Sequence, residues 1–310
     1  MMSPVVGSAL FPVILLIVLA FTIRRVGLVN DTHVAGVERV TYVVFFPALL
    51  FSNLSTASFD DLSVWSLVAV LAGLQVVLGG LSWLLLVKVL PDGPSATSAF
   101  QGANRFNSYI IFALVFAVYG DAGIQIAAVP LALMIIIVNV YCVTMLARHG
   151  TPPEGATSPN LWRSLITNPL IVACVLGLAV NPLQIEWPGP VDTMFGWFGT
   201  AAIALGLFAV GAGVAPITGK GAVLAIGLAS ATKLVVKPAI FLAIALMIGL
   251  SPDLIAIGLM CTIVPPATSA YILARQLGGN APLMAQIVTV ATILSAATVT
   301  AWFLIWPVGA

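Results

Sequence analysis

Long apolar runs, separated by short polar stretches, are the feature that most limits how this chain can fold. Its 310 residues are 61% hydrophobic, and only 7% are Asp, Glu, Lys or Arg, whereas a soluble domain carries about 25% charged residues. A water-soluble fold of this size has too little interior to hide so much apolar surface. We therefore predict an all-α integral membrane protein that is surrounded by lipid.

The apolar runs predict ten membrane-spanning helices. A helix that crosses about 30 Å of hydrocarbon needs about 20 apolar residues. Runs of about this length lie at residues 6–23, 36–55, 64–87, 96–118, 122–146, 163–182, 193–214, 221–249, 253–275 and 283–306. Arg24 and Arg25 follow the first run, whereas a signal peptide carries its positive charge before the apolar stretch. We therefore expect the first run to be a true span.

The positive charges predict the orientation of these spans. Lys and Arg residues near the span ends, such as Lys88 and Arg163, all follow odd spans or precede even ones. The opposite loops carry only acidic residues, such as Asp121 and Asp192. Because positive loops stay in the cytoplasm, we expect a multi-pass protein of the cell (inner) membrane with both termini outside, in the periplasm. The net charge of +1 predicts no nucleic-acid partner.

Two inverted repeats are predicted from the longest polar stretch. Residues 148–160 form the expected cytoplasmic linker, with five spans before it in residues 1–147 and five after it in residues 161–310. An odd number of spans gives the two halves opposite orientations. Short motifs recur at similar spacings in the two halves: Phe11-Pro12 and Asn168-Pro169, Gly120-Asp121 and Gly279-Asn280. Inverted repeats are common in secondary transporters, which place the substrate site at the repeat interface.

The fourth and ninth spans both contain residues that interrupt a helix. In span 4, a central Arg105 costs about 2.5–3.5 kcal/mol on insertion scales, and the neighbouring Asn and Ser side chains compete for backbone hydrogen bonds. In span 9, Pro265 and Pro266 remove two helix donors. Broken backbone at membrane depth is tolerated only against protein or a water-filled cavity. The second half of each span then aims its positive N-terminal dipole at the break.

Three cations are predicted inside the spans. They are Arg105 in span 4, and Lys233 and Lys237, which lie four residues apart on one face of span 8. All ten acidic residues are expected in loops or at span ends, so no buried carboxylate is left to neutralise these cations. We therefore predict that a bound organic anion, a carboxylate, neutralises them. For the same reason we expect sodium-dependence to be weak or absent, with a lysine in place of the coupling ion.

The candidate substrate-binding residues lie at the two breaks and on span 8: Asn104, Arg105, Asn107, Ser108, Lys233, Pro265, Pro266, Thr268 and Ser269. The secondary candidates are Pro47, Asn53, Lys237 and Asn139. Several of these residues also fit a structural role. Arg105 and Lys233 fit braces of the broken helices, Lys237 fits a bond to carbonyls freed by Pro238, and Asn139 fits a helix–helix hydrogen bond. Pro47 also fits a simple kink, and Asn53 an interfacial cap.

The sequence offers little for catalysis. Acid–base and metal chemistry need clusters of Asp, Glu, His or Cys. The two histidines, His33 and His149, are predicted in loops, and the three cysteines fall in apolar runs without metal-ligand spacing. We therefore expect no enzyme, no cofactor and no bound metal.

At these residues the chain resembles the auxin efflux carrier family of transporters. The matching segments occur in the family's order along nearly the whole chain. They are residues 42–51, 105–109, 233–238 and 265–271. Asn107 is similar to the Asn that plant members place at the span 4 crossing. Two departures leave the substrate open, because span 4 has no proline and span 9 offers Thr268 and Ser269 rather than an Asn.

The resemblance implies a fold, a mechanism and a substrate class. It implies a fold like that of the bile acid–sodium symporters: ten helices in two inverted five-helix repeats, with helices 4 and 9 crossing at their breaks. It further implies a scaffold of spans 1, 2, 6 and 7, which forms a homodimer, and an elevator-type transport domain of spans 3–5 and 8–10. Family substrates are small organic anions, such as auxin in plants and malate or malonate in some bacteria. We therefore expect a secondary transporter of such an anion.

One alternative stays open. Drug/metabolite-type carriers also have ten helices in two inverted halves, and they transport other small metabolites. Those carriers usually keep their termini in the cytoplasm, which disagrees with the charge pattern of this chain.

Overall fold

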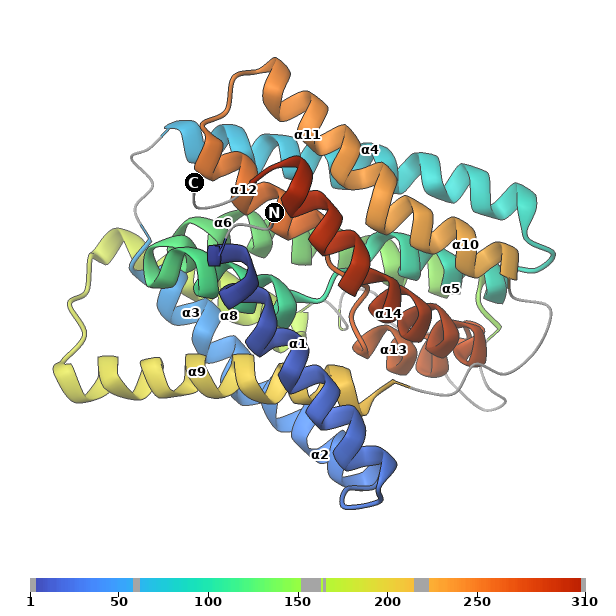
Figure 1. Ribbon diagram of the computed structural model, residues 1–310, viewed down its shortest axis with the longest axis horizontal. Coiled ribbons are helices and arrows are strands. Elements are labelled where there is room, and N and C mark those ends of the chain that lie inside the picture. The colour runs from blue at the N-terminus through green and yellow to red at the C-terminus, as the bar shows by residue number, and fades with distance from the viewer. Residues whose placement is uncertain (1–3, 58–61, 152–162, 164–165, 215–222, 308–310) are drawn as a thin grey trace.

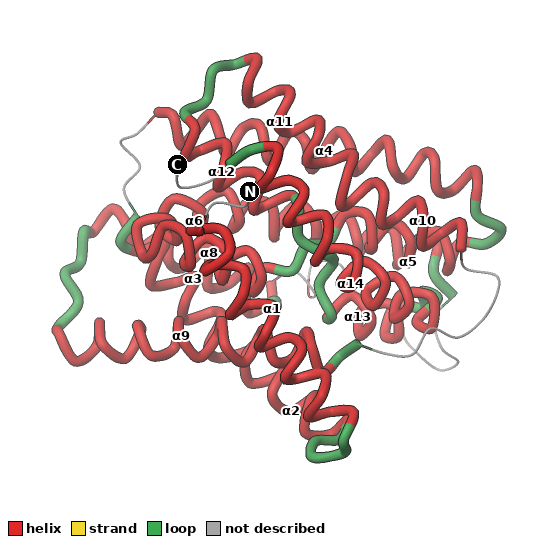
Figure 2. The backbone as a smooth tube through the Cα atoms, viewed as in Figure 1, coloured by secondary structure: helices red, strands yellow, loops and turns green. Residues whose placement is uncertain are grey.

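The structure is a computed structural model that describes residues 4–57, 62–151, 163, 166–214 and 223–307 (Figure 1). In these ranges every regular element is a helix (Figure 2). The helices are α1 (Pro4–Arg25), α2 (Asp31–Val40), η1 (Thr41–Phe45), α3 (Phe46–Ser55), α4 (Leu62–Val89), α5 (Gly93–Asn104), α6 (Ser108–His149), α8 (Pro169–Val180), η2 (Asn181–Leu183), α9 (Gly189–Ala212), α10 (Val223–Ala231), η3 (Thr232–Val236), α11 (Lys237–Met247), α12 (Pro252–Thr262), α13 (Ser269–Leu277) and α14 (Ala281–Ile305). The all-α prediction is thus confirmed for the described residues. Residues 152–160 of the predicted linker lie outside them.

Six helical segments of the described chain are long and apolar enough to cross a membrane. They are Asp31–Ser55, Ser63–Val89, Gly93–His149, Gly189–Ala212, Val223–Met247 and Ala281–Ile305, and two shorter apolar helices are Pro169–Leu183 and Pro252–Thr262. The segment Gly93–His149 has 57 residues. As one straight helix it would be about 85 Å long, far more than ~30 Å of hydrocarbon. It therefore has to change direction, and the total of ten spans in two inverted repeats stays a prediction.

Gly120 is one point at which this segment changes direction. Its φ of 60° and ψ of −151° are not helical, and glycine adopts such angles without the steric cost of a Cβ. Residues 108–119 and 121–149 of α6 are thus two helices that meet at a kink. The kink falls between the predicted spans 96–118 and 122–146.

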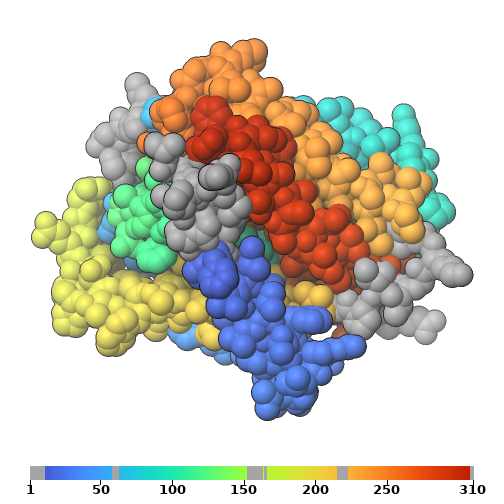
Figure 3. All heavy atoms as spheres, in the orientation of Figure 1, coloured from blue at the N-terminus to red at the C-terminus, as the bar shows by residue number. Residues whose placement is uncertain are grey.

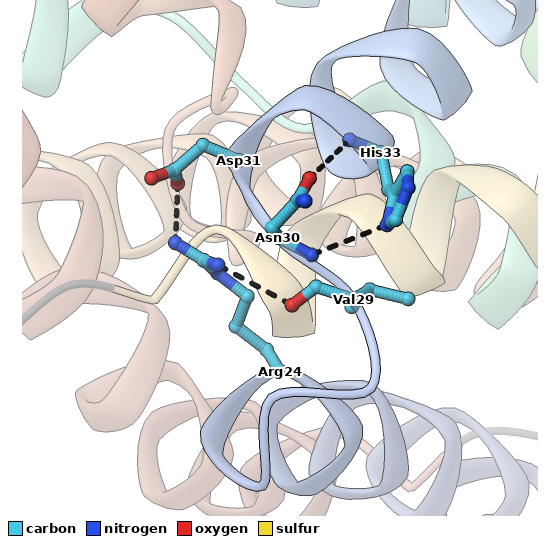
Figure 4. A network of polar contacts seen from close by, with 5 residues as sticks. All are labelled: Arg24, Val29, Asn30, Asp31 and His33. Atoms are coloured by element: carbon cyan, nitrogen blue, oxygen red, sulfur yellow. Dashed lines mark hydrogen bonds and ion pairs between the residues drawn. The ribbon is translucent and has the colours of Figure 1, made fainter.

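A short polar turn joins α1 to α2 (Figure 4). The side chain of Asn30 accepts a hydrogen bond from the N–H of His33 at 3.0 Å, and the Asn30 N–H donates to His33 Nδ1 at 3.4 Å. Arg24 forms an ion pair with Asp31 and donates to the carbonyl of Val29 at 3.4 Å. The Asn30 side chain bonds an N–H that the first turn of a helix otherwise leaves without a partner. The start of α2 at Asp31 is therefore capped.

Two of the long helices pass through a π-helical turn just before a proline. The turn η1 precedes Pro47, and η3 precedes Pro238. A proline lacks the N–H that would bond the carbonyl four residues earlier, and for Pro238 this carbonyl belongs to Leu234. The indole N–H of Trp302 in α14 donates to the Leu234 carbonyl at 2.9 Å. The helix therefore continues through η3 without leaving this carbonyl unpaired in apolar surroundings.

The contacts between helices define two groups. In the first helix group, α3 packs on α8 and α9, while α1 and α2 also pack on α9. The second helix group consists of α4, α5 and α10 to α14, which pack on one another. Helix α6 contacts both groups. In Figure 1, α3 and α9 lie at the left and α2 at the bottom, whereas α11 lies at the top and α4 and α10 extend to the right. On the face in Figure 3, the red surface of α14 lies between the blue surface of α1 and the orange surface of α10 and α11.

Candidate functional site at the two helix breaks

The first break lies between α5 and α6. Helix α5 ends at Asn104, and Arg105 leaves it in an extended conformation with φ −68° and ψ 154°. The side chain of Asn107 caps α6 by accepting hydrogen bonds from the N–H groups of Tyr109 and Ile110 at 3.1 and 3.3 Å. The predicted interruption of span 4 is therefore confirmed at these residues, and Asn107 bonds the first turn of the new helix.

The second break lies between α12 and α13. Helix α12 ends at Thr262, and α13 begins at Ser269 with Thr268 as its N-cap. Pro265 and Pro266 lie in the segment between them and are buried. Both prolines lack a backbone donor, so the predicted interruption of span 9 is confirmed at these residues.

A backbone hydrogen bond joins the two breaks directly. The N–H of Asn107 donates to the carbonyl of Pro265 at 2.9 Å. Each break thus satisfies a polar backbone group of the other, which is what broken backbone in an apolar setting requires. Helices α6 and α13 both begin here, so their positive N-terminal ends lie at the same meeting point.

Arg105 reaches from the first break to the second. Its Nη1 donates to Asn139 Oδ1 at 3.2 Å and its Nη2 to Ser269 Oγ at 3.4 Å. The side chain is 8% exposed, and its Nε is buried without a hydrogen-bond partner. Asn139 is itself held by a bond from its Nδ2 to the Ile135 carbonyl at 2.8 Å. Arg105 therefore braces both breaks and still keeps donors that protein groups do not use.

Lys237 is enclosed by hydrogen bonds to protein. Its Nζ donates to Asn104 Oδ1 at 2.9 Å and to Gln75 Oε1 at 3.1 Å. The amide nitrogen of Asn104 donates to Ser82 Oγ and to the Phe100 carbonyl, each at 2.9 Å. Gln75 also donates to the backbone carbonyl of Asn104 at 3.1 Å. This network ties α4, α5 and α11 together at the end of α5.

Lys233 has very different surroundings one helical turn earlier. It is 1% exposed and lies in the π-helical turn η3. Its Nζ sits 5.7 Å from the centre of the Phe106 ring, within cation–π range. Among the described residues no hydrogen bond to its Nζ is found, in contrast to Lys237. Lys233 is thus a buried cation beside the first break with unused donors.

Glu38 lies near the start of the predicted span 36–55, as expected, but the structure gives it a partner that the sequence did not reveal. Helix α2 runs without interruption into η1 and α3, so Glu38 lies within the candidate membrane helix Asp31–Ser55. Thr268, the N-cap of α13, donates to Glu38 Oε1 at 2.8 Å. The sequence did carry a signal, because Glu38 is four residues from both Val34 and Tyr42 and shares a helix face with them. Its partner, however, lies 230 residues away.

A cavity with apolar walls and several polar residues lies between the first helix group and α6. Its volume is about 770 Å³, and helices α1, α3, α6 and α9 line it. Ser52, Asn53, Asp121, Gln125 and Asp192 are among its lining residues. Asn53 donates to the Leu49 carbonyl at 2.8 Å within its own helix. The structure thus places the secondary candidate Asn53 on this cavity, and it places Pro47 in the first turn of α3.

The described residues offer no metal site. No three His, Cys, Asp or Glu side chains gather within this part of the chain. Cys142, Cys174 and Cys261 are buried and unpaired. The groups that the structure does place at the breaks are hydrogen-bond donors and acceptors and the cation Arg105.

Comparison with known proteins identifies the family. The sequence profile of the family described as "Membrane transport protein", which corresponds to the auxin efflux carrier family, matches residues 5–158 and 155–303. The chain belongs to this family. It is therefore a multi-pass membrane transport protein rather than an enzyme, and the resemblance seen in the sequence is confirmed. The match also argues against a drug/metabolite-type carrier.

One curated relative of this chain is a bacterial protein. A protein of Rhizobium meliloti (strain 1021) called "Putative malonate transporter" is 26% identical to this chain over 271 residues. The alignment covers 84% of this chain and 83% of the relative. The two proteins thus correspond over most of their lengths.

Proposed function

We propose that this transporter is a secondary carrier of a small organic anion, a mono- or dicarboxylate, that works by alternating access. The observation that carries the proposal is the pair Arg105 and Lys233 at the first break. The Nε of Arg105 is buried without a hydrogen-bond partner, and Lys233 is buried beside the Phe106 ring with no hydrogen bond to its Nζ found among the described residues. The single ion pair found among the described residues is Arg24–Asp31, so neither cation has an acidic partner there. A cation inside a membrane protein is costly without an opposite charge. A carboxylate substrate supplies that charge.

The geometry of the breaks supports an anion in the same place. Helices α6 and α13 direct their positive ends to the point where the breaks meet, and helix N-termini bind anions. We propose that Asn107, Ser108 and Ser269 offer hydrogen bonds around the substrate carboxylate, and that Thr268 joins them when its hydroxyl is released from Glu38. In this proposal, Pro265 and Pro266 keep the second break open. Asn104 and Lys237 hold the end of α5 in place, and Asn139 orients Arg105.

The division of the helices supports an elevator-type movement. Both breaks and Lys233 belong to or adjoin the second helix group, whereas α1, α2, α3, α8 and α9 form a separate packed unit. We propose that the first helix group is the scaffold, through which two copies associate, and that the second group carries the substrate across. The inverted repeats 1–147 and 161–310, the inner-membrane location and the periplasmic termini belong to the same proposal.

The substrate class can be tested with purified protein in proteoliposomes. Uptake of radiolabelled malonate, malate, acetate and indole-acetate is compared with uptake of a neutral sugar and of lysine. We expect saturable uptake of at least one carboxylate that unlabelled carboxylate inhibits. Saturable uptake of the neutral or cationic compounds alone would contradict an anion carrier. We also expect the carboxylate uptake to be unchanged when choline replaces sodium, because a lysine stands in for the coupling ion.

A further inference from the structure

One hydrogen bond connects the scaffold side of the molecule to the second break. Thr268 Oγ1 donates to Glu38 Oε1 at 2.8 Å. The helix that carries Glu38 is fixed in the first helix group, because Val34, one turn earlier on the same face, packs against Ala20 and Ala212 of α1 and α9. Thr268 caps α13 of the second group. Any movement of one group past the other at this end has to break the Glu38–Thr268 contact.

Glu38 is the titratable partner in the Glu38–Thr268 contact, because a threonine hydroxyl keeps its proton. On its own helix, Arg39 follows Glu38 directly and is exposed, and Tyr42 lies one turn further along. Tyr109 of α6 lies within electrostatic range of Glu38. Helix α9 packs on α2 through its last turns, whereas its Asp192 lies in the first turn. Arg275 lies in the last turn of α13 and is exposed. No ion pair of Glu38 is found within the described ranges.

The opposite end of the same helix faces an open space. Ser52 and Thr56 line the cavity of about 770 Å³ between the first helix group and α6. Ser52 lies fourteen positions after Glu38 (52 − 38), which is about 21 Å along a helix. At the Glu38 end, a side-chain contact joins the two helix groups. At the Ser52 end, a cavity separates the first helix group from α6. This asymmetry is typical of one of the two states of an alternating-access carrier.

We propose that Glu38 is a proton-binding site that controls opening at the α2–α13 end. The ionised carboxylate accepts a charge-assisted hydrogen bond from Thr268, and such bonds are roughly twice as strong as neutral ones. When the carboxylate takes up a proton from water, the charge is lost, the contact with Thr268 weakens, and the two helix groups separate at this end. Loss of the proton restores the contact. The inference rests on the proposed alternating access, and it adds a ligand, the proton, and the residue that binds it.

A labelling experiment without substrate tests this site. A cysteine is placed at Ala267, which is half-buried beside the contact, while the three native cysteines are buried. Its reaction with a maleimide is followed in proteoliposomes at alkaline and at acidic pH. At each pH the rate is divided by the rate in the same protein with Glu38→Gln, so that the pH dependence of the thiol chemistry cancels.

The expected result is slow labelling of the parent at alkaline pH and fast labelling at acidic pH, relative to Glu38→Gln. Because the neutral form keeps a hydrogen bond about half as strong, the difference of about 1–1.5 kcal/mol corresponds to a change of roughly five- to tenfold. Thr268→Val removes the donor and should give fast labelling at every pH. Glu186→Gln, the same exchange at an exposed glutamate, should behave as the parent does. Glu38→Asp keeps a carboxylate and serves as the variant if Glu38→Gln does not fold.

Two results would overturn the proposal. One is a ratio of parent to Glu38→Gln rates that does not change with pH, and the other is an equal loss of pH dependence in Glu186→Gln. Because labelling needs no substrate, its outcome is separate from that of the uptake assay. A lack of carboxylate uptake combined with pH-dependent labelling would refute the proposed substrate and leave the proton site standing.

Discussion

The backbone N–H of Asn107 donates to the carbonyl of Pro265 at 2.9 Å, and this bond joins two helix breaks that are more than 150 residues apart (265 − 107 = 158). The side chain of Asn107 performs a second task, because it caps α6. A single residue therefore both starts a helix and supports the opposite break. A substitution of the Asn107 side chain therefore removes the cap of α6 and leaves the backbone bond to Pro265 in place.

Replacement of Asn107 by Ala should abolish uptake and lower stability moderately. Loss of an N-cap costs about 1 kcal/mol, whereas the backbone bond to Pro265 does not depend on the side chain. Uptake in proteoliposomes and the Tm in detergent measure the two effects. Asn30→Ala removes another Asn cap, at an exposed turn, and should lower the Tm similarly while transport continues. Normal uptake by Asn107→Ala would show that its side chain does not serve the substrate.

Lys233 and Lys237 should differ in their effect on stability. Lys237→Met leaves Gln75 Oε1 and Asn104 Oδ1 without their donor, at about 1–3 kcal/mol for each orphaned buried group. Lys233→Met removes a buried charge that has no hydrogen bond among the described residues, so the Tm should stay the same or rise. Thermal unfolding in detergent checks both. Equal destabilisation by the two substitutions would contradict the different roles.

Arg105→Lys should impair transport although the charge is kept. The guanidinium reaches Asn139 and Ser269 with two different nitrogens, and a lysine has one nitrogen on a flexible chain. Loss of one hydrogen bond to a charged group, about 1.5–3 kcal/mol, predicts at least about a tenfold loss of uptake. Initial rates of uptake at low substrate concentration provide the measurement. A rate equal to that of the unmodified protein would mean that charge alone suffices.

Trp302→Phe should destabilise the protein, because it leaves the carbonyl of Leu234 in η3 without its donor. Pro238 frees the carbonyl of Leu234, and the Trp302 indole is its donor. An unpaired buried carbonyl costs about 1–3 kcal/mol, which would appear as a lower Tm. Trp197→Phe is the matched control, because Trp197 is 71% exposed, and it should leave the Tm unchanged. If both variants melt alike, the indole bond contributes little.

The sequence predicted the main features of the site because they depend on local chemistry. Two consecutive prolines remove two helix donors, and Asn and Ser side chains bond nearby backbone groups, so Pro265 and Asn107 marked the breaks. The separation of Lys233 from Lys237 could not be predicted, since it depends on Gln75, which lies more than 150 residues away from both. Glu38 was missed for the same reason. Its position near a span end agrees with a solvated residue, and only the fold brings Thr268 to it.

Equilibrium binding of labelled malonate to the purified protein tests most directly whether the buried cations hold an organic anion. Lys233→Met is compared with the unmodified protein and with Lys88→Met, the same exchange at an exposed lysine at the end of α4. We predict saturable binding by the unmodified protein and by Lys88→Met, and loss of binding by Lys233→Met without loss of Tm. Binding by a folded Lys233→Met that equals that of the unmodified protein would contradict the proposed anion site.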